Sequence, residues 1–136
     1  MERTLAIIKP DAADKADEIN KMIEAAGLKV IAKKTTRLSL EKAKEFYEIH
    51  KDRPFYDSLC EFMSSGDVVI EVLEGPEAVS RYRTLMGATD ARKAEEGTIR
   101  KAFGTDNQKN AVHGSDSLEN AAKEISSFFS DEEIGG

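Results

Sequence analysis

The sequence is poor in several features that mark particular classes of protein. It has a single cysteine, Cys60, so no disulfide forms within the chain, which favours a reducing compartment. No apolar run is long enough to cross a membrane, and the first residues lack the apolar stretch of a signal peptide. Basic residues number 20 against 26 acidic ones, and the net charge of −6 disfavours nucleic-acid binding. We therefore expect a cytoplasmic protein with neither membrane nor nucleic-acid partners.

The common nucleotide and metal motifs are also missing. No GxGxxG or Walker A sequence occurs, and no group of histidines, cysteines or carboxylates has metal-ligand spacing. We therefore expect no metal ligands from the protein, and any nucleotide site must be built in another way. In an acidic chain, a site for polyphosphates needs basic residues gathered locally. The candidates are Lys9, Arg83, Arg92, Lys93, Arg100 and Lys101.

The hydrophobic pattern predicts one domain over residues 1–136, with a loosely held tail at about 130–136. Strands are predicted at residues 4–8, 28–38, 68–73 and 111–112. Helices are predicted at about residues 12–26, 39–50, 55–64, 76–86 and 118–129. The polar, glycine-punctuated stretch between Gly87 and Asn110 predicts a long functional loop. Strands interleaved with helices in a short chain favour a compact α/β fold with helices packed on a sheet.

One of the two histidines, His113, lies where the last predicted strand ends, beside Gly114. An imidazole is partly neutral near pH 7 and is then a nucleophile. Together with the cations and the ring pair Phe55-Tyr56, it indicates phosphoryl transfer through a histidine. The alternative is a structural or solvated histidine, which the residues alone leave open.

The chain resembles nucleoside diphosphate kinases from about residue 2 to residue 129. The most specific match is residues 110–117 (NAVHGSDS), the active-site signature of that family. The other matching segments are residues 2–5 (ERTL), 8–11 (IKPD), 46–47 (FY), 53–55 (RPF), 64–66 (SSG), 73–75 (LEG), 86–89 (MGAT) and 97–100 (GTIR). The chain departs from the family pattern in a shorter turn without glycine at 12–18, and in a loop without proline at 90–97.

The resemblance implies transfer of the γ-phosphate of a nucleoside triphosphate, typically ATP, to a nucleoside diphosphate. His113 would attack through Nδ1 and form a phosphohistidine, in a ping-pong reaction with little base specificity. Mg²⁺ is the implied cofactor, held mainly through the nucleotide phosphates. His50 matches the family without the role of nucleophile, and we expect it to be structural.

The resemblance also implies roles for other residues. Glu124 matches the carboxylate that orients the imidazole, and Ser115 matches the hydroxyl that supports it. The matched phosphate ligands are Arg83, Thr89 and Arg100. Lys9 and Asn110 match the sugar contacts, Lys9 and Tyr47 lie near the transferred group, and Phe55 matches the ring that stacks on the base.

The fold implied by the resemblance is a ferredoxin-like, four-stranded antiparallel sheet covered by helices. The family forms tetramers or hexamers, so self-association is expected. Two other hypotheses remain. A histidine phosphocarrier would exchange phosphate with a protein and need no nucleotide pocket, and a ferredoxin-like binding module would leave His113 inert.

Overall fold

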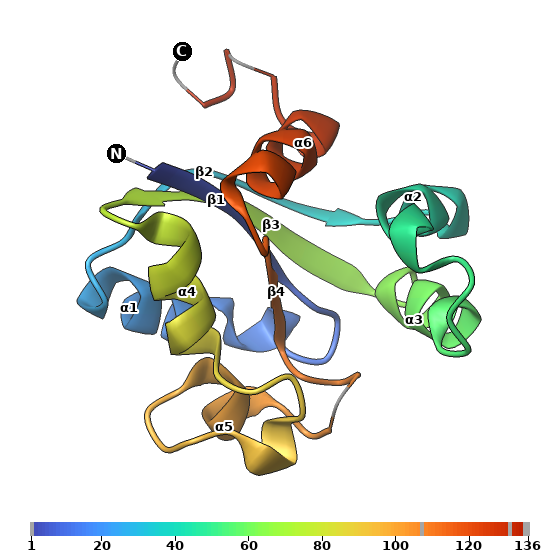
Figure 1. Cartoon of the computed structure of the whole chain (residues 1–136), viewed down its shortest axis with the longest axis horizontal. Helices are drawn as coiled ribbons and strands as arrows, with labels where there is room; N and C mark the ends of the chain where they lie inside the picture. Colours follow the sequence, from blue (N-terminus) through green and yellow to red (C-terminus); the bar gives the residue numbers. More distant parts are fainter. Residues whose placement is uncertain (1, 107, 131, 135–136) are drawn as a thin grey trace.

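The computed structural model of the chain describes residues 2–106, 108–130 and 132–134. Its centre is a four-stranded sheet with the strand order β2-β3-β1-β4, and all neighbouring strands are antiparallel (Figure 1). The strands are β1 (Glu2–Ile8), β2 (Lys29–Arg37), β3 (Asp67–Gly75) and β4 (Val112–Gly114). This sheet and the helices that cover it confirm the predicted ferredoxin-like α/β fold class.

The helices divide between the two faces of the sheet. The α-helices are α1 (Ala16–Ala25), α2 (Leu40–Phe46), α3 (Tyr56–Met63), α4 (Ala78–Met86), α5 (Ile99–Phe103) and α6 (Leu118–Phe128). Three short 3-10 helices are η1 (Ala13–Lys15), η2 (Glu48–His50) and η3 (Ala91–Lys93). Apolar residues of α1, α4 and α5 form one buried cluster, and those of α2, α3 and α6 form the other. Cys60 of α3 is buried in the second cluster.

The position of each strand explains its sequence pattern. Strand β1 lies between the two clusters: Leu5 and Ile7 belong to one, and Ala6 and Ile8 to the other. Successive side chains of a strand point to opposite faces, so a strand covered on both faces is a continuous apolar run. Strand β2 is an edge strand with several exposed residues. Apolar and polar residues therefore alternate along β2, and this alternation is the pattern from which a strand was predicted at residues 28–38.

One carboxyl lies inside the sheet. Glu71 of β3 is fully buried, opposite Ala6 of β1 and Lys33 of β2. Burial raises the pKa of this carboxyl to about 7, although Asn20 and Lys33 lower it in part. Glu71 therefore changes its charge near neutral pH while it remains in the core.

The predicted long loop between Gly87 and Asn110 contains helices, so that prediction was wrong in part. It holds η3 and α5, and the N-terminal end of α5 is capped by the Thr98 side chain, which accepts a hydrogen bond from Lys101 N at 3.3 Å. A helix of about five residues is too short to show an apolar period.

Two predicted boundaries also shift. Helix α4 begins at Ala78 because Glu77 has a left-handed backbone with φ 50°. Strand β4 begins at Val112 because Ala111 has φ 73°.

Of the predicted tail, residues 131 and 135–136 lie outside the described residues. In the described part, Glu133 forms an ion pair of 3.1 Å with Lys34. Among all described residues, no helix has the length and apolar character needed to cross a membrane.

Candidate active site

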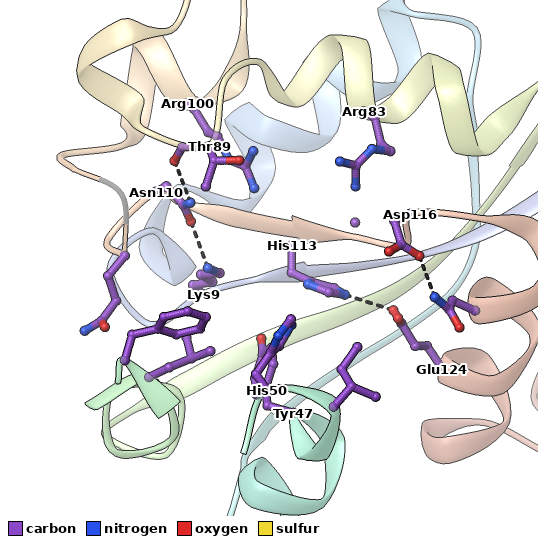
Figure 2. A pocket seen from close by; sticks show the side chains of 16 residues that line it. Lys9, Tyr47, His50, Arg83, Thr89, Arg100, Asn110, His113, Asp116 and Glu124 are labelled. Atoms are coloured by element: carbon purple, nitrogen blue, oxygen red, sulfur yellow. Dashed lines mark hydrogen bonds and ion pairs between the residues drawn. The ribbon is translucent and has the colours of Figure 1, made fainter. Parts of the chain in front are cut away.

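A cavity of about 510 Å³ opens between β4, the α2–α3 segment, α4 and the loop before β4 (Figure 2). Its volume suits a small-molecule ligand. The predicted site residues that line it are Lys9, Tyr47, Phe55, Arg83, Thr89, Arg100, Asn110, His113 and Glu124. Ser115, the remaining predicted residue, is buried and donates a hydrogen bond to Glu124, which lines the cavity. The structure therefore brings all the predicted site residues together.

His113 is oriented by a carboxylate on α6. Its Nε2 lies 2.9 Å from Glu124 Oε1, and the Ser115 hydroxyl donates to the same oxygen at 2.9 Å (Figure 2). Because a carboxylate accepts hydrogen bonds, Nε2 carries the proton and donates it. The lone pair of the neutral ring is then on Nδ1. An imidazole held in this tautomer is prepared to act as a nucleophile through Nδ1.

The alternation of β4 determines which way His113 points. Val112 belongs to the cluster beneath α4, and a Cβ atom on Gly114 would lie 2.8 Å from both Met86 Cε and Tyr82 Cδ2. Only glycine permits this close packing of β4 against α4. His113, between them, points to the opposite side of the sheet, where its ring meets that of Tyr47 edge-on at 6.1 Å.

A tight turn precedes the strand that carries His113. Val112 N donates to the Asn110 carbonyl at 2.9 Å, and Ala111 between them has φ 73°, so the three residues form a γ-turn. Two contacts from the segment after β1 hold this turn: Lys9 N donates to the Ala111 carbonyl at 2.8 Å, and Asp11 Oδ2 accepts from Ala111 N at 3.1 Å. The strained backbone is thus supported by its surroundings.

Lys9 is the most deeply buried cation of the cavity, with an exposed fraction of 6%. Its Nζ donates to Asn110 Oδ1 at 2.8 Å, and Asn110 Nδ2 donates to the Thr89 carbonyl at 2.8 Å. Burial, with a smaller contribution from Arg100, lowers the pKa of Lys9 to about 8. Lys9 is therefore mostly charged at pH 7, and its hydrogen bond to Asn110 fixes the ammonium group in the cavity, where it can bind an anion.

Two arginines occupy the wall of the cavity opposite Tyr47 and His50 (Figure 2). Arg100 donates through Nη1 to the Gly87 carbonyl at 3.1 Å and through Nη2 to the Val112 carbonyl at 3.0 Å. Arg83 comes from α4 and is more exposed. These guanidinium groups and Lys9 concentrate positive charge in an acidic protein, as a site for phosphates requires.

The other candidate cations lie outside this cavity. Arg92 forms an ion pair of 2.8 Å with Asp90 on η3, and neither Lys93 nor Lys101 lines the cavity. The charge pattern of the stretch between Gly87 and Asn110 does not distinguish these three residues from Arg83 and Arg100. The structure does so because α5 turns Arg100 inward and leaves Lys101 exposed.

Aromatic rings form the opposite wall. Phe55 is 45% exposed at the cavity mouth, whereas Tyr47 is buried deeper, beside His113. Burial raises the pKa of Tyr47 above its ordinary value, so its hydroxyl remains protonated and can act as a donor. The wall thus offers an exposed ring face near the mouth and a buried tyrosine ring beside His113.

Several lining residues were not predicted. Besides Gly114, the neighbour of His113, they are Ile49, His50, Leu59, Gln108, Asp116 and Asn120. Asp116 belongs to the 110–117 segment, so proximity to His113 was an available signal. Asn120 follows it by one helical turn and donates to Asp116 Oδ1 at 2.6 Å. The others lie in segments whose path around the cavity is set by tertiary packing.

No group of three or more histidine, cysteine or carboxylate residues that could hold a metal ion occurs in the part of the chain that the structure describes. The carboxylates of the cavity are Asp116 and Glu124, and Glu124 already accepts two hydrogen bonds. A divalent cation here would need most of its oxygen ligands from a bound molecule, which is common for Mg²⁺ with nucleotide phosphates.

Comparisons with known proteins point to one family and one fold. The sequence model of the family described as nucleoside diphosphate kinase matches residues 2–134. The nucleoside diphosphate kinase of Maricaulis maris is 54% identical, over 100% of this chain and 99% of the relative. The crystal form of the Aquifex aeolicus nucleoside diphosphate kinase has a TM-score of 0.91 at 48% identity, covering 98% of both chains. The Halobacterium salinarum enzyme in complex with CDP has a TM-score of 0.92 at 42% identity, covering 97% of this chain and 90% of that one.

Proposed function

Because the chain belongs to the nucleoside diphosphate kinase family of phosphotransferases, we propose that it transfers the γ-phosphate of a nucleoside triphosphate to a nucleoside diphosphate through a phosphohistidine at His113. The observation that carries this proposal is the 2.9 Å contact between His113 Nε2 and Glu124 Oε1. It leaves Nδ1 as the nucleophilic nitrogen, in a cavity that also holds Lys9, Arg83 and Arg100.

The first half-reaction forms one bond and breaks another. The Nδ1 lone pair attacks the γ-phosphorus, and the bond from that phosphorus to the bridging oxygen breaks, so the nucleoside diphosphate leaves with the electron pair. Negative charge spreads over the phosphate oxygens, where Lys9, Arg83 and Arg100 stabilise it. A second diphosphate then enters and takes the phosphoryl group in the reverse step, which makes the reaction ping-pong.

Glu124 and Ser115 are positioning residues in this scheme. When Nδ1 bonds to phosphorus, the imidazole becomes a cation with its remaining proton on Nε2. Glu124 Oε1 accepts that proton's hydrogen bond and stabilises the positive ring, while the Ser115 hydroxyl holds the carboxylate in place.

Nucleotide binding follows from the two walls. Phe55 offers an exposed ring on which any base stacks, so we expect little base specificity. Lys9 and Asn110 would contact the sugar, and Arg83, Thr89 and Arg100 the phosphates. The Halobacterium salinarum relative in complex with CDP supports nucleotides as the substrate class.

We include Mg²⁺ in the proposal, held mainly by nucleotide phosphate oxygens. Asp116, whose Oδ1 accepts a hydrogen bond from Asn120, is the carboxylate that lines the cavity besides Glu124. When bound, this ion neutralises part of the phosphate charge. The proposal extends to one domain over residues 1–136 and a cytoplasmic location, both predicted from the sequence pattern and composition, and to self-association into a tetramer or hexamer, which the family resemblance implies.

The test is to incubate the protein with γ-labelled ATP and Mg²⁺, remove the nucleotide, and measure acid-labile, alkali-stable label on the chain. Addition of GDP should discharge the label as GTP. His113→Ala should acquire no label, whereas His50→Ala should still acquire it. Absence of label on the wild type, or undiminished label on His113→Ala, would contradict the mechanism.

The same experiment separates the two rival functions. A phosphocarrier would accept label only from a phosphorylated protein and would tolerate Phe55→Ala and Arg83→Ala. An inert binding module would take up no label from any donor. The cavity of about 510 Å³, with its cations and exposed ring, favours the kinase over both.

A further inference from the structure

Three buried side-chain groups that interact with one another have no hydrogen-bond partner in the described part of the chain. They are the Nε–H of Arg100, the hydroxyl of Tyr82 and the carboxyl of Glu71. Buried polar groups in folded proteins almost always have a partner, either another protein group or an ordered water. The three are also complementary, because Nε–H donates, a hydroxyl both donates and accepts, and a carboxylate accepts. A path from Arg100 through Tyr82 to Glu71 would therefore satisfy all of them.

The register of the sheet brings Tyr82 and Glu71 to the same place. Gly114 of β4 is opposite Ala6 of β1, and Ala6 is opposite Glu71 of β3, so these three residues form one row across the sheet. Residues directly opposite on neighbouring strands share a face. The Tyr82 ring packs closely on this row, because a Cβ atom on Gly114 would lie 2.8 Å from Tyr82 Cδ2 and 2.9 Å from Cε2. Two small residues thus leave room above the sheet for a ring beside a buried carboxyl.

Tyr82 interacts electrostatically with both of the other groups. Burial raises the pKa of its hydroxyl most, Glu71 raises it further, and Arg100 lowers it in part, so the hydroxyl stays protonated. Burial lowers the pKa of Arg100, and Tyr82 opposes that change. No direct hydrogen bond joins the three groups. A bound water between two buried polar groups is a common way to connect them.

The groups that face Glu71 come from four elements. Strand β1 contributes Ala6, and β2 contributes Lys33, an exposed residue directly opposite Glu71. Helix α1 contributes the amide of Asn20, and α4 contributes Tyr82. Among these neighbours, Tyr82 is the one that also interacts with a residue lining the cavity. A change in the charge of Glu71 therefore reaches the cavity through α4.

We propose that Tyr82 is a positioning residue for Arg100, whose Nε–H it links to the Glu71 carboxylate through internal water. The inference rests on the proposed function, in which Arg100 binds phosphate oxygens (Figure 2). Arg100 already donates through Nη1 to the Gly87 carbonyl and through Nη2 to the Val112 carbonyl. A third contact at Nε fixes the plane of the guanidinium group. It thereby sets the direction of the N–H groups that remain for phosphate.

The charge of Glu71 determines how strong this link is. An ionised carboxylate attracts the hydroxyl proton of Tyr82, and this polarisation makes the hydroxyl oxygen a better acceptor toward Arg100. A protonated carboxyl polarises the hydroxyl less. Because the pKa of Glu71 is about 7, the link is stronger above that pH and weaker below it.

The link has a spectroscopic test that needs no nucleotide. The ¹⁵N–¹H signal of Arg100 Nε, assigned by its loss in Arg100→Lys, should move as Glu71 titrates, with a midpoint near pH 7. Glu71→Gln should abolish this movement. Tyr82→Phe should also abolish it, although this variant keeps the ring against Gly114. Movement that persists in either variant would overturn the proposal.

The effect on binding is measured by calorimetry with ADP and Mg²⁺. At about pH 8, Tyr82→Phe and Glu71→Gln should each weaken binding about fivefold relative to wild type, and at about pH 6 each should be within about twofold of it. Comparison at one pH cancels the titration of the nucleotide itself. Thr84→Val removes an exposed hydroxyl from α4, and Glu74→Gln removes a partly exposed carboxyl from β3. Both are controls and should equal wild type. An equal loss at both pH values would indicate a purely structural role and contradict the proposal.

A double-variant comparison tests whether Tyr82 acts through Arg100. Arg100→Lys keeps a positive charge but has no Nε–H, so adding Tyr82→Phe to it should weaken ADP binding no further. Fully additive losses would overturn the positioning role. Label uptake from ATP is a separate readout: if the wild type takes up none, the mechanism at His113 fails, while the Arg100 signal still decides the link. If Tyr82→Phe does not fold, a high-resolution crystal structure of the wild type decides instead. It should show a water within hydrogen-bond distance of the Tyr82 hydroxyl, and a hydroxyl without one would contradict the proposal.

Discussion

Asp11 accepts a hydrogen bond from the backbone N–H of Ala111 at 3.1 Å, across a sequence separation of 100 residues. The contact joins the segment after β1 to the γ-turn before β4. Ala111 has the left-handed backbone of that turn and lies two residues before His113. A carboxylate far away in sequence therefore helps to determine where the nucleophile stands.

Replacing Asp11 with alanine should lower stability. The Ala111 N–H is left without its acceptor in a partly buried position, which costs about 1–3 kcal/mol. Thermal or urea unfolding measures the change, and Asp14→Ala, an exposed carboxylate on η1, is the control. Equal unfolding midpoints for Asp11→Ala and Asp14→Ala would show that the contact does not support the turn.

Glu124→Gln should slow the phosphorylation of His113 by about 10- to 100-fold, because the carboxylate that orients the ring and balances its charge is lost. Nucleotide KM values should change little. Ser115→Ala should have a smaller effect, and the double variant should resemble Glu124→Gln, since Ser115 acts through the same oxygen. Rapid-quench measurement of the labelled protein gives these rates. Glu119→Gln on the exposed side of α6 is the control, and fully additive effects would contradict the shared role.

The charge of Lys9 should make nucleotide binding pH-dependent. Burial lowers the pKa of this amine to about 8, so the cation is present below that pH and is lost as the pH rises through it. The value of kcat/KM should therefore fall between about pH 7 and 9. Lys9→Gln should have a low kcat/KM at pH 7 with no further fall near pH 8. The same alkaline fall in both proteins would assign it to another group.

Glu71 should make stability depend on pH in the opposite sense to an ordinary ion-paired carboxyl. Its pKa is about 7 when folded, against 4.5 ordinarily, so the folded state binds the proton more tightly. Stability is then greatest at low pH within this window, falls as the pH rises from about 4.5 to about 7, and levels off above it. Urea unfolding should show a loss on the order of 1–3 kcal/mol over this range. Glu71→Gln should remove most of this slope, and an unchanged slope would exclude Glu71 as its source.

Much of the fold was readable from local pattern. Residues 5–8 form a continuous apolar run, and residues 68–73 form one that only Glu71 interrupts, because β1 and β3 are covered on both faces. Strands interleaved with helices indicated an α/β fold, whereas the ferredoxin-like antiparallel sheet was implied by the family resemblance. The helix at 99–103 was missed because it is too short to show a period, and Ala111 gave no sign of its left-handed backbone. That conformation depends on Asp11 and Lys9, which lie close only after folding.

The candidate site was likewise predictable from the sequence only in part. The signature at 110–117 indicated His113, and the family resemblance supplied its partners, which the structure places together. The charge pattern did not separate Arg92 from Arg100, but the family resemblance selected Arg100, and the packing of α5 turns it inward. His50 was expected to be structural because it matches the family without the role of nucleophile, and a histidine on a helix has no sequence pattern that reveals a cavity. Its place beside Phe55 depends on how η2 and α3 meet.

The pairing of β4 with β1 has a consequence for the order of events during synthesis. The first strand emerges from the ribosome early, but its neighbour on one side, and the helix that carries Glu124, come near the end of the chain. Lys9 can therefore contact Asn110 only after the 101 residues that separate them in sequence have been synthesised, and His113 follows three residues later. A growing chain therefore contains Lys9 early, but it cannot complete its active site until α6, which carries Glu124, has been made.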